Sequence, residues 1–452
     1  MEPAPRYLLT SYGCQMNKLD SELVESRLVA AGYERAEGED DADVVLLNTC
    51  SVRQHAEDRV WSRLGRLRQA KRQRPELVVG VLGCMAQEHQ RYLQARMPHV
   101  DLVVGPSAFG DIDEQVAAAR GRTRDAAAVL AVDDGVSGDR IRRDVRMRPH
   151  RSQAYVSVMR GCNMPCSYCI VPTTRGREVS RPIADIVEET QRLCDDGVQE
   201  ITLLGQTVNA YGRDLGRDVT LARLLAALHA IPALRRIAFI TSHPNFLSPD
   251  LIDAIADLPR VARYLHLPAQ SGSDRVLKAM RRGYTQQRYL ARVAQLRARA
   301  PGVELHSDWI VGYPGEDDAD FACTVELMES VRFAQSYVFK YSPRPGTVAA
   351  GLDDDVPEAT KAERNGILLE VQERHTLAAN RALVGSVQEV LVEGPSKVAG
   401  RWSGRTDQHR IVHFPEDGRA LAGCFVPLRI TEALGHSLVG ELLADDHAEV
   451  SA

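Results

Sequence analysis

The sequence predicts an α/β protein with three parts: an N-terminal open parallel α/β sheet, a central partial (β/α)6 barrel and a small C-terminal all-β barrel. Apolar runs alternate with helix-like stretches up to about residue 380, which is typical of βαβ units. A stretch rich in arginine interrupts this alternation near residue 140. Beyond residue 380 the apolar runs are short and separated by turn residues, as in a small β-barrel. We therefore expect an N-terminal domain over residues 1–138, a basic linker over 139–153, a central domain over 154–380 and a C-terminal domain over 381–445.

Three apolar runs of the N-terminal part each end in a cysteine: Cys14, Cys50 and Cys84. The runs are rich in valine and leucine, as strands buried on both faces of a parallel sheet are. The cysteines are 36 and 34 residues apart, about the length of one βαβ unit. Because ligand sites of open α/β sheets lie at the carboxyl ends of the strands, we expect the three thiols to meet there. The alternative is three small buried cysteines, which are common in protein cores.

Two stretches of the chain are strongly basic. Six arginines lie between Arg140 and Arg151, and eight basic against two acidic residues lie between Arg53 and Arg74. Both stretches are candidate tracks for nucleic-acid phosphates. For the first stretch a solvated connector is an equal alternative.

Six βα units follow in the central part. A complete barrel of this kind has eight, so six units predict an open, partial barrel whose site lies at the carboxyl ends of the strands. The expected strands fall within residues 154–162, 200–206, 235–244, 264–272, 303–315 and 336–346.

The first strand of this barrel runs into the sequence RGCNMPCSYCIVP, which holds Cys162, Cys166 and Cys169. Structural zinc takes four protein ligands, and a four-iron cluster also has four ligand positions. Three cysteines therefore leave one iron open to bind a small molecule. A zinc site or a plain electron-transfer cluster is the alternative.

This Cys-x3-Cys-x2-Cys triplet at the end of a first barrel strand resembles the radical S-adenosylmethionine (SAM) superfamily. SYGCQMNKLDSE, NTCSVRQHAE and GCMAQ resemble the N-terminal signatures of its methylthiotransferase family. LLGQTVNAYG, HLPAQSGSDRVLKAMRRGYT and DWIVGYPGE resemble the radical SAM domain of that family, and the C-terminal part resembles its TRAM domain, an RNA-binding β-barrel. The resemblance covers nearly the whole chain.

The resemblance implies two 4Fe–4S clusters and SAM. One cluster would be held by Cys162, Cys166 and Cys169, and the other by Cys14, Cys50 and Cys84. The motifs GCQMN and NTCSVR are most similar to the branch that converts N6-isopentenyladenosine next to the anticodon of tRNA (position 37) to its 2-methylthio derivative. The alternatives are the branches that act on an aspartate of a small-subunit ribosomal protein or on threonylcarbamoyladenosine in tRNA. An iron–sulfur electron carrier is a remote alternative.

Polar residues at the strand ends are the candidate SAM ligands, since a carboxamide or hydroxyl there could bond the amino group of SAM. A convincing acid–base triad is missing from the sequence, so the catalytic residues stay unknown. His243 and His266, at strand ends, are predicted to be structural, and a role as pocket residues is the alternative. In the C-terminal barrel, Arg401, Arg405, His409 and Arg410 are the best candidate RNA contacts. The candidate SAM ligands are Gly205, Gln206, Asn209, Ser242, Gln270, Asp308 and Arg175.

Composition places limits on location and partners. The net charge is −5, and the sequence lacks both a signal peptide and an apolar run of 18 residues. We therefore expect a cytoplasmic protein that does not bind membranes, in which nine cysteines indicate metal binding or catalysis more than disulfides. Cys194, Cys323 and Cys424 are expected to be ordinary buried thiols. The expected partners are tRNA and an electron donor such as flavodoxin or ferredoxin, and the expected state is a monomer.

Overall fold

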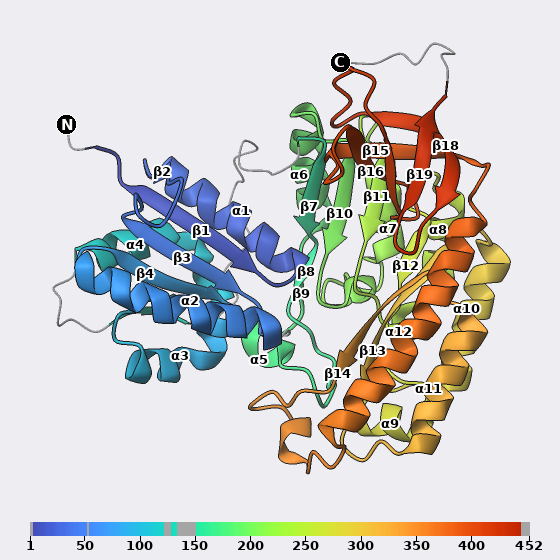
Figure 1. The fold of residues 1–452 in the computed structure, drawn as a ribbon, viewed down its shortest axis with the longest axis horizontal. Helices are drawn as coiled ribbons and strands as arrows, with labels where there is room; N and C mark the ends of the chain where they lie inside the picture. The colour runs from blue at the N-terminus through green and yellow to red at the C-terminus, as the bar shows by residue number, and fades with distance from the viewer. Residues whose placement is uncertain (1–2, 52–53, 122–127, 133–150, 444–452) are drawn as a thin grey trace. The chain divides into compact units, whose positions relative to one another are not determined.

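The computed structural model describes residues 3–51, 54–121, 128–132 and 151–443 (Figure 1). The chain forms two compact units. The first comprises residues 1–149, 159–164 and 169–179, and the second comprises residues 150–158, 165–168 and 180–452. Most of the expected basic linker, residues 139–150, lies outside the described residues.

The N-terminal unit is built on a six-stranded parallel sheet with the order β2-β1-β3-β4-β5-β6 (Figure 1). Every residue of β3 and β4 is buried, as the continuous apolar runs predict. The four expected strands are confirmed, whereas the short β2 and β6 were not expected. The strands are β1 Arg6–Tyr12, β2 Glu34–Arg35, β3 Val44–Thr49, β4 Val78–Gly83, β5 Leu102–Val104 and β6 Val129–Ala131.

Helices cover both faces of this sheet. α1 (Gln15–Ala30) contributes Val24 and Leu28 to one apolar cluster, and α4 (Ile112–Arg120) contributes Ile112 to the same cluster. α2 (Gln54–Gln73) and α3 (Cys84–Arg96) contribute to another. Because β1, β3 and β4 are neighbours, the three cysteines that follow them stand at one edge of the sheet, as expected.

The second unit begins with six parallel strands in two three-stranded sheets, β7-β10-β11 and β12-β13-β14. A bridge between Ile237 and Val261 lies at the junction, and among the described residues nothing pairs with the outer edges of β7 and β14. This is the predicted open, partial barrel, which is called the half-barrel below. Its strands are β7 Gln153–Ser157, β10 Glu200–Leu204, β11 Arg236–Phe239, β12 Tyr264–His266, β13 Glu304–Val311 and β14 Gln335–Lys340.

Helices lie outside these strands (Figure 1). Trp309 of β13 is fully buried and packs edge-on against Phe333, which also contacts Tyr289 of α10. The helices of the chain from residue 171 to residue 381 are α5 Val171–Arg175, α6 Ile183–Asp195, α7 Leu221–His229, α8 Pro249–Asp257, α9 Asp274–Ala279, α10 Gln286–Arg299, α11 Asp318–Val331 and α12 Glu358–Arg381. Shorter elements are β8 Met159–Arg160, β9 Val179–Ser180, and the 3-10 turns η1 Pro106–Asp111, η3 Val208–Ala210, η4 Pro244–Phe246 and η5 Ala349–Gly351.

The face of β12, β13 and β14 that lies opposite the side chain of Trp309 is called the inner face below. Side chains alternate along a strand, and parallel register places partners on the same side. The inner face therefore carries Tyr264, His266, Glu304, His306, Asp308, Ile310, Gln335, Tyr337 and Phe339.

Residues 387–442 form a closed five-stranded β-barrel with the order β15-β16-β17-β19-β18. The predicted all-β barrel is thus confirmed, although β16 was not expected. The strands are β15 Val387–Pro395, β16 Arg401–Arg405, β17 Ile411–Pro415, β18 Phe425–Ala433 and β19 Leu438–Leu442.

This barrel is anchored to the half-barrel by two of the expected RNA contacts. Arg410 is buried and forms an ion pair of 2.8 Å with Glu304, and the ring of His409 stacks on Tyr264. Arg405 pairs with Glu393 at 2.9 Å. Since Arg410 and His409 are used inside the unit, their expected role in RNA binding is corrected here to an anchoring role. None of the described helices combines the length and apolar character of a membrane span.

Candidate functional site

The N-terminal cysteines sit in backbone turns that leave no room for larger neighbours. Gly13 and Gly83 each precede a cysteine, with φ of 131° and 88°. A Cβ atom at Gly13 would lie 2.3 Å from the Cβ atom of Cys50, and one at Gly83 would lie 2.4 Å from Asn48 Oδ1. Positive φ and close approach both require glycine. These glycines therefore let the ends of β1, β3 and β4 approach one another.

Two buried asparagines tie the same strand ends together. Asn17 Oδ1 accepts hydrogen bonds from the backbone N–H of Cys14 at 3.4 Å and from its thiol at 3.1 Å. Asn48 donates to the carbonyl of Asn17 at 2.9 Å and to Ser21 Oγ at 3.0 Å. Both asparagines are fully buried. This network fixes the start of α1 against the end of β3.

Arg175 lies beside this site. Its Nε donates to Cys84 Sγ at 3.3 Å, and its Nη2 donates to Asp20 Oδ2 at 2.6 Å. The side chain of Arg175 is 5% exposed and that of Asp20 is fully buried. Arg175 was expected to bind SAM or RNA phosphate. The structure instead gives its guanidinium a cysteine sulfur and a carboxylate, both in the N-terminal unit.

The pKa values of Cys14 and Cys84 are shifted in opposite directions. A hydrogen bond with Cys50 lowers the pKa of Cys14 to about 6, with help from the nearby Arg175. Burial raises the pKa of Cys84, and Arg175 opposes that rise. Metal ligands must be thiolates, and a cationic environment favours the thiolate. Three gathered thiols beside a buried guanidinium are therefore a donor set that fits an iron–sulfur cluster.

The central triplet also has backbone that requires glycine. Gly161, next to Cys162, has a φ of 69°, and a Cβ there would lie 2.0 Å from the carbonyl oxygen of Arg177. The backbone N–H of Cys162 donates to the carbonyl of Gly176 at 3.2 Å. Cys162, Cys166 and Cys169 are not joined in disulfides, and the donor chemistry of three cysteines fits an iron–sulfur site.

Arg282 is a site residue that the sequence analysis missed. Its Nη1 donates to Cys166 Sγ at 3.4 Å, and its Nε and Nη2 donate to Tyr284 Oη and to the carbonyl of Pro268. Its side chain is buried. The MRRGYT segment contains this arginine, but neighbouring arginines in the sequence gave no signal that one of them reaches a cysteine across 116 residues.

After the first strands of the half-barrel, some polar side chains are hydrogen-bonded within the loops and others have no partner among the described residues. Asn209 exchanges hydrogen bonds of 2.9 and 2.8 Å with the backbone of His243, so its amide holds that loop. Burial lowers the pKa of His243 to about 2, and its Nδ1 accepts from Asn245 N–H, in line with a structural role. Gln206 Oε1 and Ser242 Oγ are buried without a hydrogen-bond partner among the described residues, and Gly205 precedes them at the end of β10.

The later strand ends carry strained backbone and a contact between an imidazole and a carboxylate. Thr241 and Gln270 have φ of 69° and 67°, which is uncommon for residues with side chains and concentrates at functional sites. His266 Nδ1 accepts from the backbone N–H of Thr241 at 3.3 Å, and its Nε2 lies 3.1 Å from Asp308 Oδ1. The first contact requires an unprotonated Nδ1, so Nε2 carries the proton and donates to Asp308.

An exposed aromatic pair continues the inner face beyond Asp308. Tyr337 is paired in register with Asp308, and Phe339 with Ile310. The two rings stack with their centroids 6.5 Å apart, and they are 50% and 38% exposed. A flat apolar surface next to a carboxylate and an imidazole suits a heteroaromatic base.

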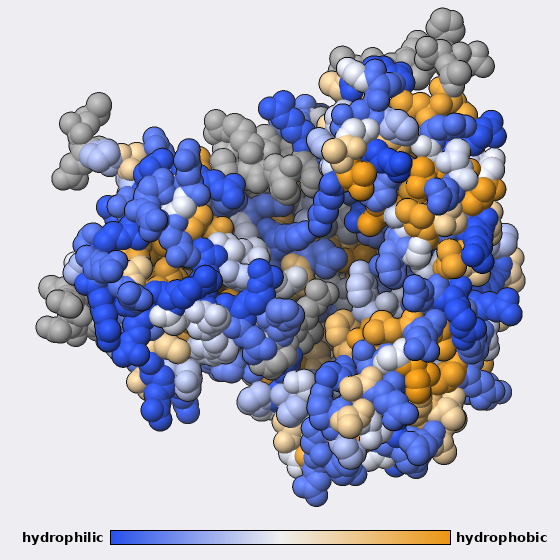
Figure 2. Space-filling view, viewed as in Figure 1, coloured by the Kyte–Doolittle hydropathy of each residue, from blue (hydrophilic) through white to orange (hydrophobic). Residues whose placement is uncertain are grey.

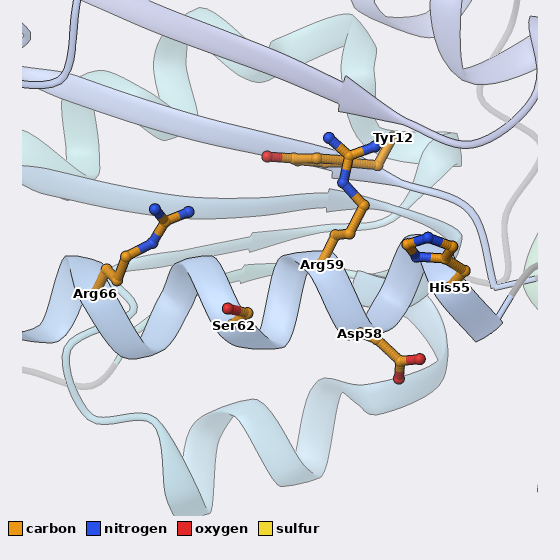
Figure 3. A pocket seen from close by; sticks show the side chains of 6 residues that line it. All are labelled: Tyr12, His55, Asp58, Arg59, Ser62 and Arg66. Atoms are coloured by element: carbon orange, nitrogen blue, oxygen red, sulfur yellow. The ribbon is translucent and has the colours of Figure 1, made fainter.

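The exposed side of α2 carries several arginines, and this part of the surface is hydrophilic (Figure 2). Part of it lines a pocket in which the guanidinium of Arg59 lies 5.0 Å from the ring centre of Tyr12 (Figure 3). Of the expected phosphate track, Arg63 and Lys71 are used internally, on Glu39 and Asp101. The exposed cations that remain on the helix are Arg59, Arg66, Arg68 and Arg72.

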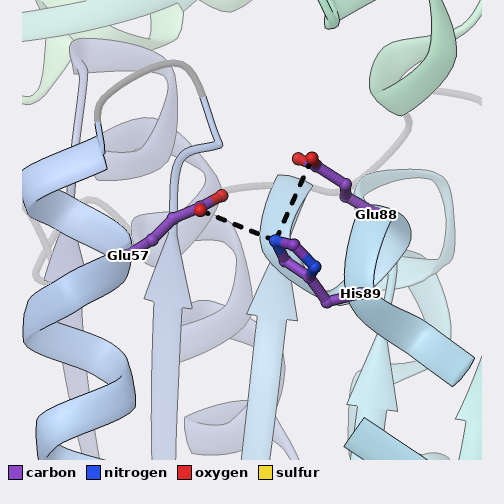
Figure 4. A group of neighbouring side chains, drawn as sticks. All are labelled: Glu57, Glu88 and His89. Atoms are coloured by element: carbon purple, nitrogen blue, oxygen red, sulfur yellow. Dashed lines mark ion pairs between the residues drawn. The ribbon is translucent and has the colours of Figure 1, made fainter. Parts of the chain in front are cut away.

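A third group of side chains joins α2 to α3. His89 Nε2 lies 3.5 Å from Glu57 Oε2 and 3.9 Å from Glu88 Oε1 (Figure 4). The backbone of α3 leaves helical geometry at His89, with φ −102° and ψ 16°. When His89 is protonated, its contact with Glu57 is an ion pair that links α3 to α2, whereas its contact with Glu88 lies within α3. No sequence pattern predicted this group, since its members come from separate helices.

Three family models match the chain. An uncharacterized protein family, UPF0004, matches residues 6–105, the radical SAM superfamily matches residues 156–328, and the TRAM domain matches residues 381–443.

Full-length relatives are named tRNA-2-methylthio-N(6)-dimethylallyladenosine synthase. The protein of Syntrophobacter fumaroxidans is 45% identical, covering 99% of this chain and 98% of that protein. The protein of Ralstonia pickettii is 44% identical and covers 99% of both chains. The protein of Akkermansia muciniphila is 43% identical over 96% of this chain and 98% of that protein.

Two solved structures share the fold. The radical SAM methyltransferase TsrM of Kitasatospora setae, solved with cobalamin and a 4Fe–4S cluster, superposes with a TM-score of 0.53 at 15% identity, over 77% of this chain and 74% of that chain. The cobalamin-dependent radical SAM enzyme OxsB gives a TM-score of 0.51 at 13% identity, over 82% of this chain and 56% of that chain.

Proposed function

Because this chain belongs to the family of the tRNA-2-methylthio-N(6)-dimethylallyladenosine synthases, we propose that it converts N6-isopentenyladenosine next to the anticodon of tRNA (position 37) to its 2-methylthio derivative. The observation that carries this proposal is the identity of 43–45% over nearly the whole length of these relatives. Both cysteine triplets and the three matched domains agree with it.

The chain uses SAM and iron–sulfur chemistry, as its radical SAM domain implies. We propose two 4Fe–4S clusters. Cys162, Cys166 and Cys169 would hold the cluster that binds SAM, and Cys14, Cys50 and Cys84 would hold the second. When bound, these groups supply the abstraction of hydrogen from an unactivated C–H bond and the sulfur that replaces it.

The strand ends of the half-barrel are the proposed SAM site. Gln206 and Ser242 offer buried oxygen atoms that still lack partners among the described residues. Gly205 permits SAM to approach the backbone closely. Gln270, which follows β12, has a strained backbone of the kind found at functional sites. Asn209 acts indirectly, by fixing the loop at His243.

The inner face is the proposed site of the adenine ring. Tyr337 and Phe339 offer a stacking surface, Ile310 lies beside Phe339 in register, and Asp308 is held by His266. The substrate carbon is an aromatic C–H, which is neither acidic nor labile. The task of these residues is therefore to hold the ring and to exclude water, rather than to move a proton.

Binding of tRNA requires cationic surface outside the pocket. The exposed arginines of α2 and the C-terminal barrel are the proposed contacts. After Arg410 and His409 are assigned to the anchor, Arg401 and Arg405 are the candidates left in the barrel from the original four. We further propose a cytoplasmic monomer that receives electrons from a flavodoxin or ferredoxin.

The direct test is mass spectrometry of tRNA nucleosides. A strain lacking its own synthase should accumulate N6-isopentenyladenosine, and expression of this chain should restore the 2-methylthio nucleoside. Restored methylthiolation of a ribosomal protein or of threonylcarbamoyladenosine, in strains that lack the enzymes for those modifications, would instead assign the chain to another branch. Absence of 5′-deoxyadenosine from anaerobic, reduced enzyme with SAM would favour the electron carrier.

A further inference from the structure

The contact between Arg175 and Cys84 joins two motifs that the sequence treats as separate. Arg175 follows Cys169 by six residues, on the short helix α5, yet it donates to a cysteine of the N-terminal triplet. Asp20 of α1 holds the other end of the guanidinium at 2.6 Å. The pair is enclosed, since the two side chains are 5% and 0% exposed.

This arrangement is incomplete as a structural ion pair. Arg175 Nη1 and Asp20 Oδ1 are both buried, and neither has a hydrogen-bond partner among the described residues. A buried polar group without a partner costs about 1–3 kcal/mol, and more when it is charged. A simple ion pair would be expected to satisfy both groups. The free donor therefore points to an anionic acceptor that belongs to the site.

We propose that Arg175 is a positioning residue of the N-terminal cysteine site, where it donates to the Cys84 sulfur and to the anionic cluster that the three cysteines hold. Asp20 fixes the guanidinium in place, and the pair sets the reduction potential of that cluster. This inference rests on the proposed second cluster.

The expected direction follows from charge. Reduction adds an electron to a group that is already anionic, so hydrogen bonds and positive charge near its sulfurs favour the reduced form. Replacing Arg175 with glutamine removes the charge and leaves Asp20 as a buried anion, so the potential should fall. Replacing Asp20 with asparagine leaves the guanidinium unopposed, so the potential should rise.

The test uses the full chain with Cys162, Cys166 and Cys169 changed to alanine, so that the iron measured belongs to the N-terminal site. After anaerobic reconstitution, iron content and an EPR-monitored redox titration are compared for this background and for added Arg175→Gln, Arg175→Lys and Asp20→Asn. Arg282→Gln is the matched control, because Arg282 is a buried arginine that contacts Cys166 instead.

We expect Arg175→Gln to change the ratio of reduced to oxidised cluster about tenfold at a fixed potential, which is a fall of about 59 mV for one electron. The reduction potential of Arg175→Lys should lie between those of the background and Arg175→Gln. The potential of Asp20→Asn should be higher than that of the background, and the potential of Arg282→Gln should equal it. Retention of iron should weaken about 10- to 100-fold in Arg175→Gln, as for other residues that hydrogen-bond to metal ligands.

Equal potentials in the background and in all three Arg175 and Asp20 variants would overturn the inference and leave a structural ion pair. If Arg175→Gln loses its iron, the potentials of Arg175→Lys and Asp20→Asn provide the test. A lower potential for the first and a higher one for the second support the inference, and potentials equal to that of the background overturn it. A background that binds no iron at all would instead contradict the proposed second cluster, so the two failures are distinguishable.

Discussion

The ring of Tyr264 contacts His409 on the C-terminal barrel and His306 on the half-barrel, with centroids 5.0 Å apart in both pairs. The two imidazoles thus flank the Tyr264 ring in a stacked column that links the parts of the second unit, with Tyr264 and His306 buried and His409 partly exposed. Arg410 and Glu304 close the same junction with an ion pair. The position of the C-terminal barrel on the half-barrel therefore depends on keeping both imidazoles uncharged.

Acid should loosen this junction. Burial lowers the pKa of His409 to about 3, with Arg405 and Arg236 adding repulsion, and burial lowers the pKa of His306 well below its usual value. The unfolded chain takes up these protons near pH 6.5, whereas the folded chain resists them. The free energy of unfolding should therefore fall as the pH drops from 6.5 towards 3.

His409→Asn tests this pH dependence, because asparagine tolerates the φ of 68° found at this position but does not titrate. At pH 7.5 the variant should be less stable, by about 0.5–1.5 kcal/mol for the lost ring contact. The difference in the free energy of unfolding between the parent and the variant should be smaller at pH 5.5, because only the parent loses stability through His409. Thermal unfolding followed by circular dichroism at both pH values measures this difference. A constant difference would show that His409 is not the titrating group.

Iron content should separate the two cysteine triplets. Two four-iron sites predict about eight irons per chain after anaerobic reconstitution. Cys162→Ala, Cys166→Ala and Cys169→Ala together should leave about four. A full iron load in this variant would mean that the cysteines are divided differently.

Tyr337→Ala together with Phe339→Ala should weaken use of the tRNA substrate. Stacking of a base on an aromatic side chain contributes about 1–3 kcal/mol, so the KM should rise roughly tenfold or more. Cleavage of SAM without tRNA should persist. Tyr337→Phe should behave like the parent, and Leu369→Ala, an exposed apolar residue of α12, is the matched control. An unchanged KM in the double variant would place the adenine elsewhere.

Arg282→Gln should disturb the central cluster and spare the N-terminal one. In a chain with Cys14, Cys50 and Cys84 changed to alanine, loss of the bond to Cys166 should weaken iron retention about 10- to 100-fold. Arg175→Gln in that same chain should retain its iron. Loss of iron in both variants would indicate general unfolding, which circular dichroism would reveal.

The sequence was sufficient for the elements whose pattern is local. Runs such as Val44–Thr49 are apolar throughout because both faces of the strand are covered, and the cysteine after each run marks the strand end. The strand Arg401–Arg405 was missed because it carries two arginines and a glycine. Gly404 is needed there, since a Cβ would lie 2.4 Å from the carbonyl oxygen of Leu391.

Pairings between distant side chains could not be predicted. Arg175 and Cys84 are 91 residues apart, and Arg410 and Glu304 are 106 apart. Nothing in the local sequence distinguishes a buried arginine from an exposed one, because both are flanked by similar residues. Only the packing of the strands decides which cations are enclosed and which remain for tRNA.

We propose that the two triplets have separate tasks, with radical formation at Cys162, Cys166 and Cys169 and sulfur transfer at Cys14, Cys50 and Cys84. The most direct measurement follows both products from the variant with Cys14, Cys50 and Cys84 changed to alanine, incubated anaerobically with reductant, SAM and isopentenylated tRNA. We predict that mass spectrometry will detect 5′-deoxyadenosine but no 2-methylthio nucleoside. Methylthiolated nucleoside made by this variant would show that sulfur transfer does not depend on Cys14, Cys50 and Cys84.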